Sequence, residues 1–140
     1  MLYENTGYEI KDGQKQALWD LYCGNDAILV ACTGYGKTHV IVGYHATLDR
    51  KVDPITLVIS PLKAIEQGQA RDAFKTYHQL GVRPFVLDGE NNTPDNRHDI
   101  ARGRYTHVWL SAEIAVGEAL EDPSKVFSKS SQLRTYITCI

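Results

Sequence analysis

The chain has 140 residues, of which 43% are hydrophobic and 23% charged, a balance typical of a globular domain rather than a disordered chain. Its formal net charge is −2, so overall charge does not indicate a nucleic-acid-binding protein and does not exclude a local basic groove. The three cysteines show no C-x-x-C spacing, which argues against a zinc site or a disulfide framework and indicates a reducing compartment.

Two helices and one strand are predicted at the beginning of the chain. Residues 14–23 form the first predicted helix, because apolar residues recur at helical spacing and Gly24 supplies a left-handed stop. The apolar run at residues 27–31 does not alternate with polar residues, which is typical of a strand whose sheet is covered on both faces. The second helix is predicted over residues 38–50, after a glycine-rich stretch.

Predicted strands and helices then alternate along the chain. The strands are predicted at residues 55–60, 83–87, 106–111 and 133–140, and the helices at residues 61–80, 94–102 and 111–120. In the first of these helices Ala73, Phe74 and Tyr77 are expected on the buried face. Thr93 is expected to cap the second helix, with Pro94 as its first residue.

This alternation indicates the fold class. The connections are long enough for crossovers, so the sequence predicts an α/β fold with a mostly parallel sheet and helices on both faces. Ligands of such sheets bind beyond the carboxyl ends of the strands, and the glycine-rich stretch follows one of the predicted strands. The length fits one domain over residues 1–140.

The glycine-rich stretch ACTGYGKT, residues 31–38, is typical of a phosphate-binding loop. It matches the pattern G-x-x-x-x-G-K-[ST] except that Ala31 stands in the place of the first glycine. Gly34 and Gly36 let backbone N–H groups turn towards phosphate oxygens, where a Cβ would obstruct them. The predicted helix that follows presents its positive end to the anion.

Each part of this stretch has a predicted role. Lys37 is predicted to reach the β- and γ-phosphates of a nucleotide, and the Thr38 hydroxyl to bind Mg²⁺, so these two are the candidate catalytic residues. The main-chain amides from Thr33 to Thr38, that of Tyr35 included, are predicted to line a pocket for the triphosphate tail. The alternative is a plain glycine turn with an exposed lysine, which the predicted strand before and helix after disfavour.

The stretch also resembles the A-x-T-G-x-G-K-T form of superfamily 2 helicases. Residues 6–18, TGYEIKDGQKQAL, are similar to the motif ahead of the first strand in RecQ-type DNA helicases, where an aromatic residue, a basic residue and a glutamine read adenine. The resemblance implies that Tyr8 stacks near the base, Lys11 stands in for the usual arginine and Gln14 hydrogen-bonds the adenine edge. Two positions depart from the motif, because Ile10 replaces an aromatic residue and Lys11 lacks the planar guanidinium.

Two later stretches resemble RecQ-type motifs that contact nucleic acid. VISPLKAIEQGQA, residues 58–70, resembles the motif that reads S-P-L and ends in a glutamine. HVWLSAEIAV, residues 107–116, is similar to the strand and loop that normally end in Pro-Glu, with Ala112 in place of the proline. Each stretch alone also fits ordinary turn chemistry, so their order and spacing carry the resemblance. The nucleic-acid contacts that it implies are Ser60, Pro61, Leu62, Gln69, Ser111 and Glu113.

The resemblance implies the N-terminal part of the first RecA-like lobe of an ATP-dependent DNA helicase. ATP, Mg²⁺ and single-stranded or forked DNA are the implied ligands, and RNA is less expected. The Asp-Glu pair of the family's D-E-x-H motif does not occur in the 140 residues, so ATP binding without hydrolysis or unwinding is expected. The complete family enzyme moves 3′ to 5′ along DNA in recombination and repair, which implies a nuclear location in a eukaryote and a cytoplasmic one otherwise. No secretory signal and no apolar run long enough to span a membrane are visible.

Two other functions stay open. Another superfamily 2 member, such as an RNA helicase or a translocase, would share the glycine-rich stretch. The DEAD-box form of these motifs, with a proline in the glutamine motif and P-T-R-E-L in the next, is not present. The second alternative is a non-enzymatic nucleotide-binding module. Preference for a DNA or an RNA substrate distinguishes the first alternative, and ATP turnover distinguishes the second.

Overall fold

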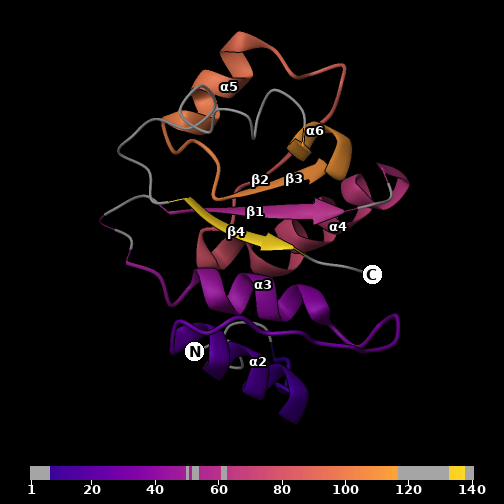
Figure 1. The fold of residues 1–140 in the computed structure, drawn as a ribbon, viewed down its shortest axis with the longest axis vertical. Helices are drawn as coiled ribbons and strands as arrows, with labels where there is room; N and C mark the ends of the chain where they lie inside the picture. The colour runs from indigo at the N-terminus through magenta and orange to yellow at the C-terminus, as the bar shows by residue number, and fades with distance from the viewer. Residues whose placement is uncertain (1–6, 50, 52–53, 61–62, 117–132, 138–140) are drawn as a thin grey trace. The chain divides into compact units, whose positions relative to one another are not determined.

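The structure, a computed structural model, describes residues 7–49, 51, 54–60, 63–116 and 133–137. The chain divides into two compact units, Met1–Leu48 and Asp49–Ile140. In chain order the elements are α2 (Asp12–Tyr22), α3 (Lys37–His45), β1 (Ile55–Ser60), α4 (Lys63–Tyr77), the 3₁₀ turn η2 (His78–Leu80), β2 (Pro84–Leu87), α5 (Pro94–Ala101), β3 (His107–Ser111), α6 (Ala112–Val116) and β4 (Leu133–Ile137) (Figure 1).

Two helices, α2 and α3, pack against each other in the described part of the N-terminal unit. α2 begins before Gln14, the predicted start, because the Gln14 side chain reaches back from the third helical position and its Oε1 accepts the N–H of Lys11 at 2.9 Å. α3 ends earlier than predicted, because Thr47 donates both its N–H and its hydroxyl to the carbonyl of Tyr44, at 2.8 and 2.7 Å. Both predicted helices are therefore present, and side-chain hydrogen bonds explain why α2 begins earlier and α3 ends earlier than predicted.

The strand predicted at residues 27–31 is not a strand in the structure, so this prediction was wrong. Residues 25–32 have no regular secondary structure, and the side chains of Ile28 and Val30 are 94% and 92% exposed. A strand needs a neighbouring strand to complete its backbone hydrogen bonds. The described residues of the N-terminal unit contain none, so an apolar run alone does not produce the strand.

Within the described residues of the C-terminal unit, four parallel strands form a sheet in the order β2-β3-β1-β4. β1 has the predicted bounds, and β2 and β3 each begin one residue later than predicted. β4 covers the described part of the predicted last strand, whose residues 138–140 lie outside the described residues. The crossovers that parallel strands require contain α4, between β1 and β2, and α5, between β2 and β3.

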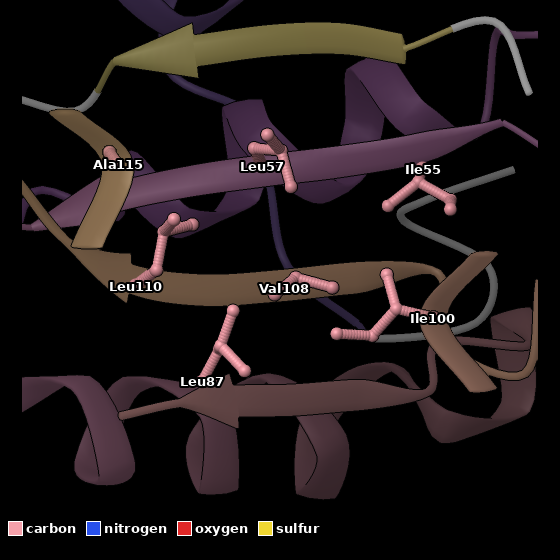
Figure 2. Close-up of a cluster of buried hydrophobic side chains, with 7 residues drawn as sticks. All are labelled: Ile55, Leu57, Leu87, Ile100, Val108, Leu110 and Ala115. Carbon is pink, nitrogen blue, oxygen red and sulfur yellow. The ribbon is translucent and has the colours of Figure 1, made fainter. Parts of the chain in front are cut away.

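A hydrophobic core lies between one face of this sheet and the helices α5 and α6 (Figure 2). Leu57 of β1 and Val108 of β3 are partners in register, so their side chains point to the same face. Ile100 of α5 and Ala115 of α6 meet them there (Figure 2). The full cluster consists of Ile55, Leu57, Leu87, Ile100, Val108, Leu110 and Ala115.

Helix α4 packs on the opposite face of the sheet (Figure 1). Val58 and Trp109, also partners in register, are fully buried on that face, because successive side chains of a strand alternate. Ala73 and Tyr77 of α4 are buried as predicted, whereas Phe74 is 51% exposed. Phe74 lies about 100° around the helix from Ala73, which turns it away from the sheet. Helices cover both faces, so the predicted α/β class is confirmed.

A hydroxyl residue directly precedes each of the helices α5 and α6. α5 begins as predicted at Pro94, and the Thr93 hydroxyl accepts the N–H of Asn96 at 3.3 Å. α6 covers the first part of the predicted last helix, whose residues 117–120 lie outside the described residues. Among the helices of the described residues, none combines the length and apolar character that crossing a membrane would need.

Candidate nucleotide-binding site

The glycine-rich stretch forms a loop that leads into α3. Its backbone is left-handed at Gly34 and Gly36, with φ of 80° and 91°, a conformation that residues with a side chain rarely adopt. The N–H of Tyr35 donates to the carbonyl of Cys32 at 3.2 Å and closes a turn. Gly36 is the N-cap of α3. The backbone therefore turns directly into a helix start, which is one part of the strand–loop–helix geometry of the phosphate-binding pattern, whereas the strand predicted before the loop is not present in residues 25–32.

The two glycines of the loop differ in their surroundings. Among the described residues, leaving aside Gly34 and its two chain neighbours, no atom lies within 4 Å of the position that a Cβ would occupy at Gly34, so that side of the loop is open. At Gly36 a Cβ would meet three side-chain atoms: Gln14 Nε2 at 2.7 Å, the Tyr8 hydroxyl oxygen at 2.9 Å and His39 Nδ1 at 3.0 Å. Gly36 is thus needed both for its φ angle and for the close approach of these groups.

The Lys37 ammonium binds the carbonyls of its own loop. Lys37 Nζ donates to the carbonyl oxygen of Ala31 at 2.9 Å and to that of Cys32 at 3.2 Å. A positive charge therefore sits inside the turn, held by neutral acceptors. A phosphate group would be a stronger partner for this ammonium, because a hydrogen bond between two charged groups is stronger than one to a neutral carbonyl.

The start of α3 adds a second source of positive potential. The first N–H groups of a helix have no acceptor within the helix, and the first turn of α3 carries no acidic residue that would oppose an anion. Thr38 is the second residue of α3, and its hydroxyl is the hard oxygen ligand that Mg²⁺ takes in proteins. These residues fit an ATP–Mg²⁺ ligand. Lys37 and the loop amides would hold the phosphates, and Thr38 the metal ion, whose charge would offset that of the phosphates.

Gln14 lies fully buried beside the loop. Its Nε2 donates to the carbonyl oxygens of Gly36 at 2.8 Å and Tyr35 at 3.0 Å, and its Oε1 accepts the N–H of Lys11. The main-chain partners define which end of the amide is oxygen and which is nitrogen. In this arrangement the amide is engaged by the chain itself, so an adenine edge can pair with it only by replacing some of these bonds.

Tyr8, Lys11 and His39 complete the surroundings of Gln14. The rings of Tyr8 and His39 lie against each other, with their centroids 3.7 Å apart. Burial lowers the pKa of His39, and the positive charge of Lys11 lowers it further, against a hydrogen bond with the Gly36 backbone that raises it. The structure therefore brings the predicted residues Tyr8, Lys11 and Gln14 to the loop that carries Lys37.

Two residues outside the predicted set, Gly13 and His39, also contact this site. A Cβ at Gly13 would lie 2.8 Å from the Tyr35 hydroxyl oxygen, so a residue larger than glycine would force that hydroxyl to move. The signal in the sequence is a glycine at the start of a helix, where most residues form helix better. No pattern in the sequence indicates the Tyr8–His39 ring pair.

The predicted nucleic-acid contacts lie in the C-terminal unit. Ser60 and Ser111 are register partners at the carboxyl ends of β1 and β3, and both are buried. The Ser111 hydroxyl accepts the N–H of Ile114 at 3.3 Å at the start of α6. Gln69 is half-buried on α4, and Glu113 is exposed on α6. Pro61 and Leu62 lie outside the described residues.

The comparisons with known proteins agree with the loop and the sheet. A family model for DEAD/DEAH box helicases matches residues 11–133, a stretch that contains the glycine loop and all three strands from β1 to β3. No curated protein matches the sequence. The parallel sheet with helices on both faces is consistent with the α/β fold of a RecA-like helicase domain. The chain belongs to the DEAD/DEAH box helicase family.

Proposed function

We propose that this chain binds ATP with Mg²⁺ in the glycine loop, as the nucleotide-binding part of a RecQ-type DNA helicase, within one RecA-like domain over residues 1–140. The observation that supports ATP binding most is the position of Lys37. Its ammonium lies inside a loop with two left-handed glycines, directly before the N-terminus of α3. The positive groups of lysine, helix end and metal ion would balance a triphosphate tail.

The adenine-reading part of the proposal rests on the segment ahead of the loop. Gln14 and Lys11 lie beside the loop, and Tyr8 offers an aromatic ring at the same place. An amide carries a donor and an acceptor side by side, which is what the edge of adenine requires. Because the Gln14 amide is hydrogen-bonded to the loop carbonyls of Tyr35 and Gly36, binding of the base would replace some of these hydrogen bonds and so change the loop.

The DNA part of the proposal rests on the motifs of the C-terminal unit. Ser60 and Ser111 end neighbouring parallel strands, and ligands of open α/β sheets bind beyond such ends. The buried Ser111 hydroxyl would act by holding the start of α6, while Gln69 and Glu113 would contact the nucleic acid. The S-P-L form of the motif at residues 58–70, in place of the P-T-R-E-L of DEAD-box RNA helicases, favours DNA over RNA.

A nucleotide titration tests ATP binding. Lys37→Ala should weaken binding of ATP–Mg²⁺ by about 10- to 100-fold, because a charged hydrogen bond to phosphate contributes about 1.5–3 kcal/mol. Lys15→Ala is the matched control, since Lys15 is an exposed lysine of the same unit whose ammonium pairs with Asp12 and not with the loop carbonyls in the described residues. Unchanged affinity in Lys37→Ala would remove the basis of the proposal.

A second titration tests the preference for DNA. Single-stranded DNA should bind more tightly than single-stranded RNA of the same length and base order, and Gln69→Ala should weaken DNA binding. Gln67→Ala is the control, because Gln67 is an exposed amide two positions away on α4. Tighter binding of RNA would instead favour an RNA helicase or translocase.

A further inference from the structure

Three donors from the segment ahead of α2 and its first turn converge on one carbonyl of the loop. The carbonyl oxygen of Tyr35 accepts hydrogen bonds from Gln14 Nε2 at 3.0 Å, Lys11 Nζ at 3.1 Å and the Tyr8 hydroxyl at 3.3 Å. These three donors are the residues proposed to read the base. The apex of the phosphate loop is thus bound directly to the proposed base-reading segment.

The side chain of Tyr35 reinforces this attachment. The Lys11 ammonium lies 4.5 Å from the centroid of the Tyr35 ring, within the range of a cation–π interaction. The phenol reaches α2, where a Cβ added at Gly13 would lie 2.8 Å from its hydroxyl oxygen and 3.7 Å from Cζ. A glycine at this helical position weakens the helix relative to alanine. The Tyr35 hydroxyl lies close to where a Cβ would be, which gives a physical reason for the glycine.

We infer that Tyr35 is a positioning residue that couples base recognition to phosphate recognition, and this inference rests on the proposed binding of ATP. The backbone of Tyr35 belongs to the loop that would hold the phosphates, while its ring and carbonyl hold the segment that would hold the base. Any movement of the loop as phosphates replace the Lys37 contacts therefore moves Gln14 as well. Adenine and triphosphate bind as one ligand because Tyr35 joins their two subsites.

Two ligands separate coupling from simple loop structure. ATP–Mg²⁺ engages both subsites, whereas inorganic tripolyphosphate with Mg²⁺ engages only the loop. Tyr35→Ala should weaken ATP binding about tenfold while tripolyphosphate binding changes less than about twofold, because the lost ring contacts lie on the base side. Tyr35→Phe keeps the ring beneath Lys11 and should retain ATP affinity within about twofold.

A double-mutant cycle between Gly13 and Tyr35 gives a sharper test. Gly13→Ala should weaken ATP binding, because the new methyl group displaces the Tyr35 hydroxyl. In the Tyr35→Phe background the nearest ring atom would be the carbon at 3.7 Å, an ordinary contact, so Gly13→Ala should then have little effect on ATP affinity. The midpoint of thermal unfolding of each variant reports whether the fold is retained.

The possible results separate the inference from the proposed function. If Lys37→Ala weakens both ligands and Tyr35→Ala weakens only ATP, the inference stands. If Lys37→Ala weakens both ligands but Tyr35→Ala affects both equally or neither, Tyr35 does not couple the subsites and the inference is overturned alone. Equal effects of Gly13→Ala in the two backgrounds would also overturn it. If Lys37→Ala changes the affinity for neither ligand, the proposed function itself is overturned.

Discussion

Gln14 donates from its buried Nε2 to the carbonyl oxygen of Gly36 at 2.8 Å, so the first turn of α2 holds the residue that caps α3. The same amide binds Tyr35 and Lys11 through their main chains. A residue proposed to recognise a base therefore also joins the two helices of the N-terminal unit. Its replacement should change folding stability even without nucleotide.

Gln14→Glu should lower the free energy of unfolding by about 2–3 kcal/mol, because a carboxylate cannot donate to the two loop carbonyls and would be buried. Urea denaturation at neutral pH without nucleotide measures this change. Gln16→Glu is the matched control on the same helix. Gln16 is exposed and its side-chain amide donates to Asp20, so its replacement should cost about 0.2–0.5 kcal/mol. Equal stability of Gln14→Glu and the wild type would show that the amide bonds contribute nothing to folding.

The elements of the sheet could be predicted from the sequence because each is specified locally. The run at residues 55–60 is buried on both faces and has the predicted bounds, and Thr93-Pro94 begins α5 as its residue types indicate. The chemistry of Lys37 also follows from its place in the loop pattern. These features depend on residues that lie close together in the sequence.

The contacts around Tyr35 could not be predicted in this way. Its carbonyl accepts three donors, and every residue type has the same carbonyl, so the sequence contains no signal for that role. The strand predicted at residues 27–31 failed for a related reason. Strand formation depends on a partner strand that is often distant in the chain, and apolar composition does not identify that partner.

The absence of a strand at residues 27–31 predicts a contrast between two apolar side chains. Ile28→Ala should change the free energy of unfolding by less than about 0.5 kcal/mol, because Ile28 is 94% exposed. Leu57→Ala, in the core of Figure 2, should cost about 2–5 kcal/mol, because it leaves a cavity in this buried cluster. Chemical denaturation of both variants measures the contrast. A cost for Ile28→Ala comparable to that of Leu57→Ala would show that Ile28 is buried, as a covered strand would require.

His39 should make stability depend on pH near neutrality. Its pKa is lowered from the ordinary value of 6.5, first by burial and then by the charge of Lys11, against the raising effect of the Gly36 backbone. Between the folded pKa and 6.5 the unfolded chain binds more protons than the folded one, so stability rises with pH. The contribution of neutral His39 is therefore fully present above pH 6.5 and is lost as pH falls towards the folded pKa.

Two variants isolate this contribution. His39→Phe keeps an aromatic ring against Tyr8 but cannot titrate, and His39→Gln removes both the ring and the titration. Urea denaturation of the wild type and both variants from pH 5.5 to 7.5 measures the slope of stability against pH. Both variants should show a shallower rise than the wild type, and the stability difference between His39→Phe and His39→Gln should stay constant across the range. If all three proteins have the same slope, His39 keeps its ordinary proton affinity in the folded chain and the Tyr8–His39 pair does not bury it.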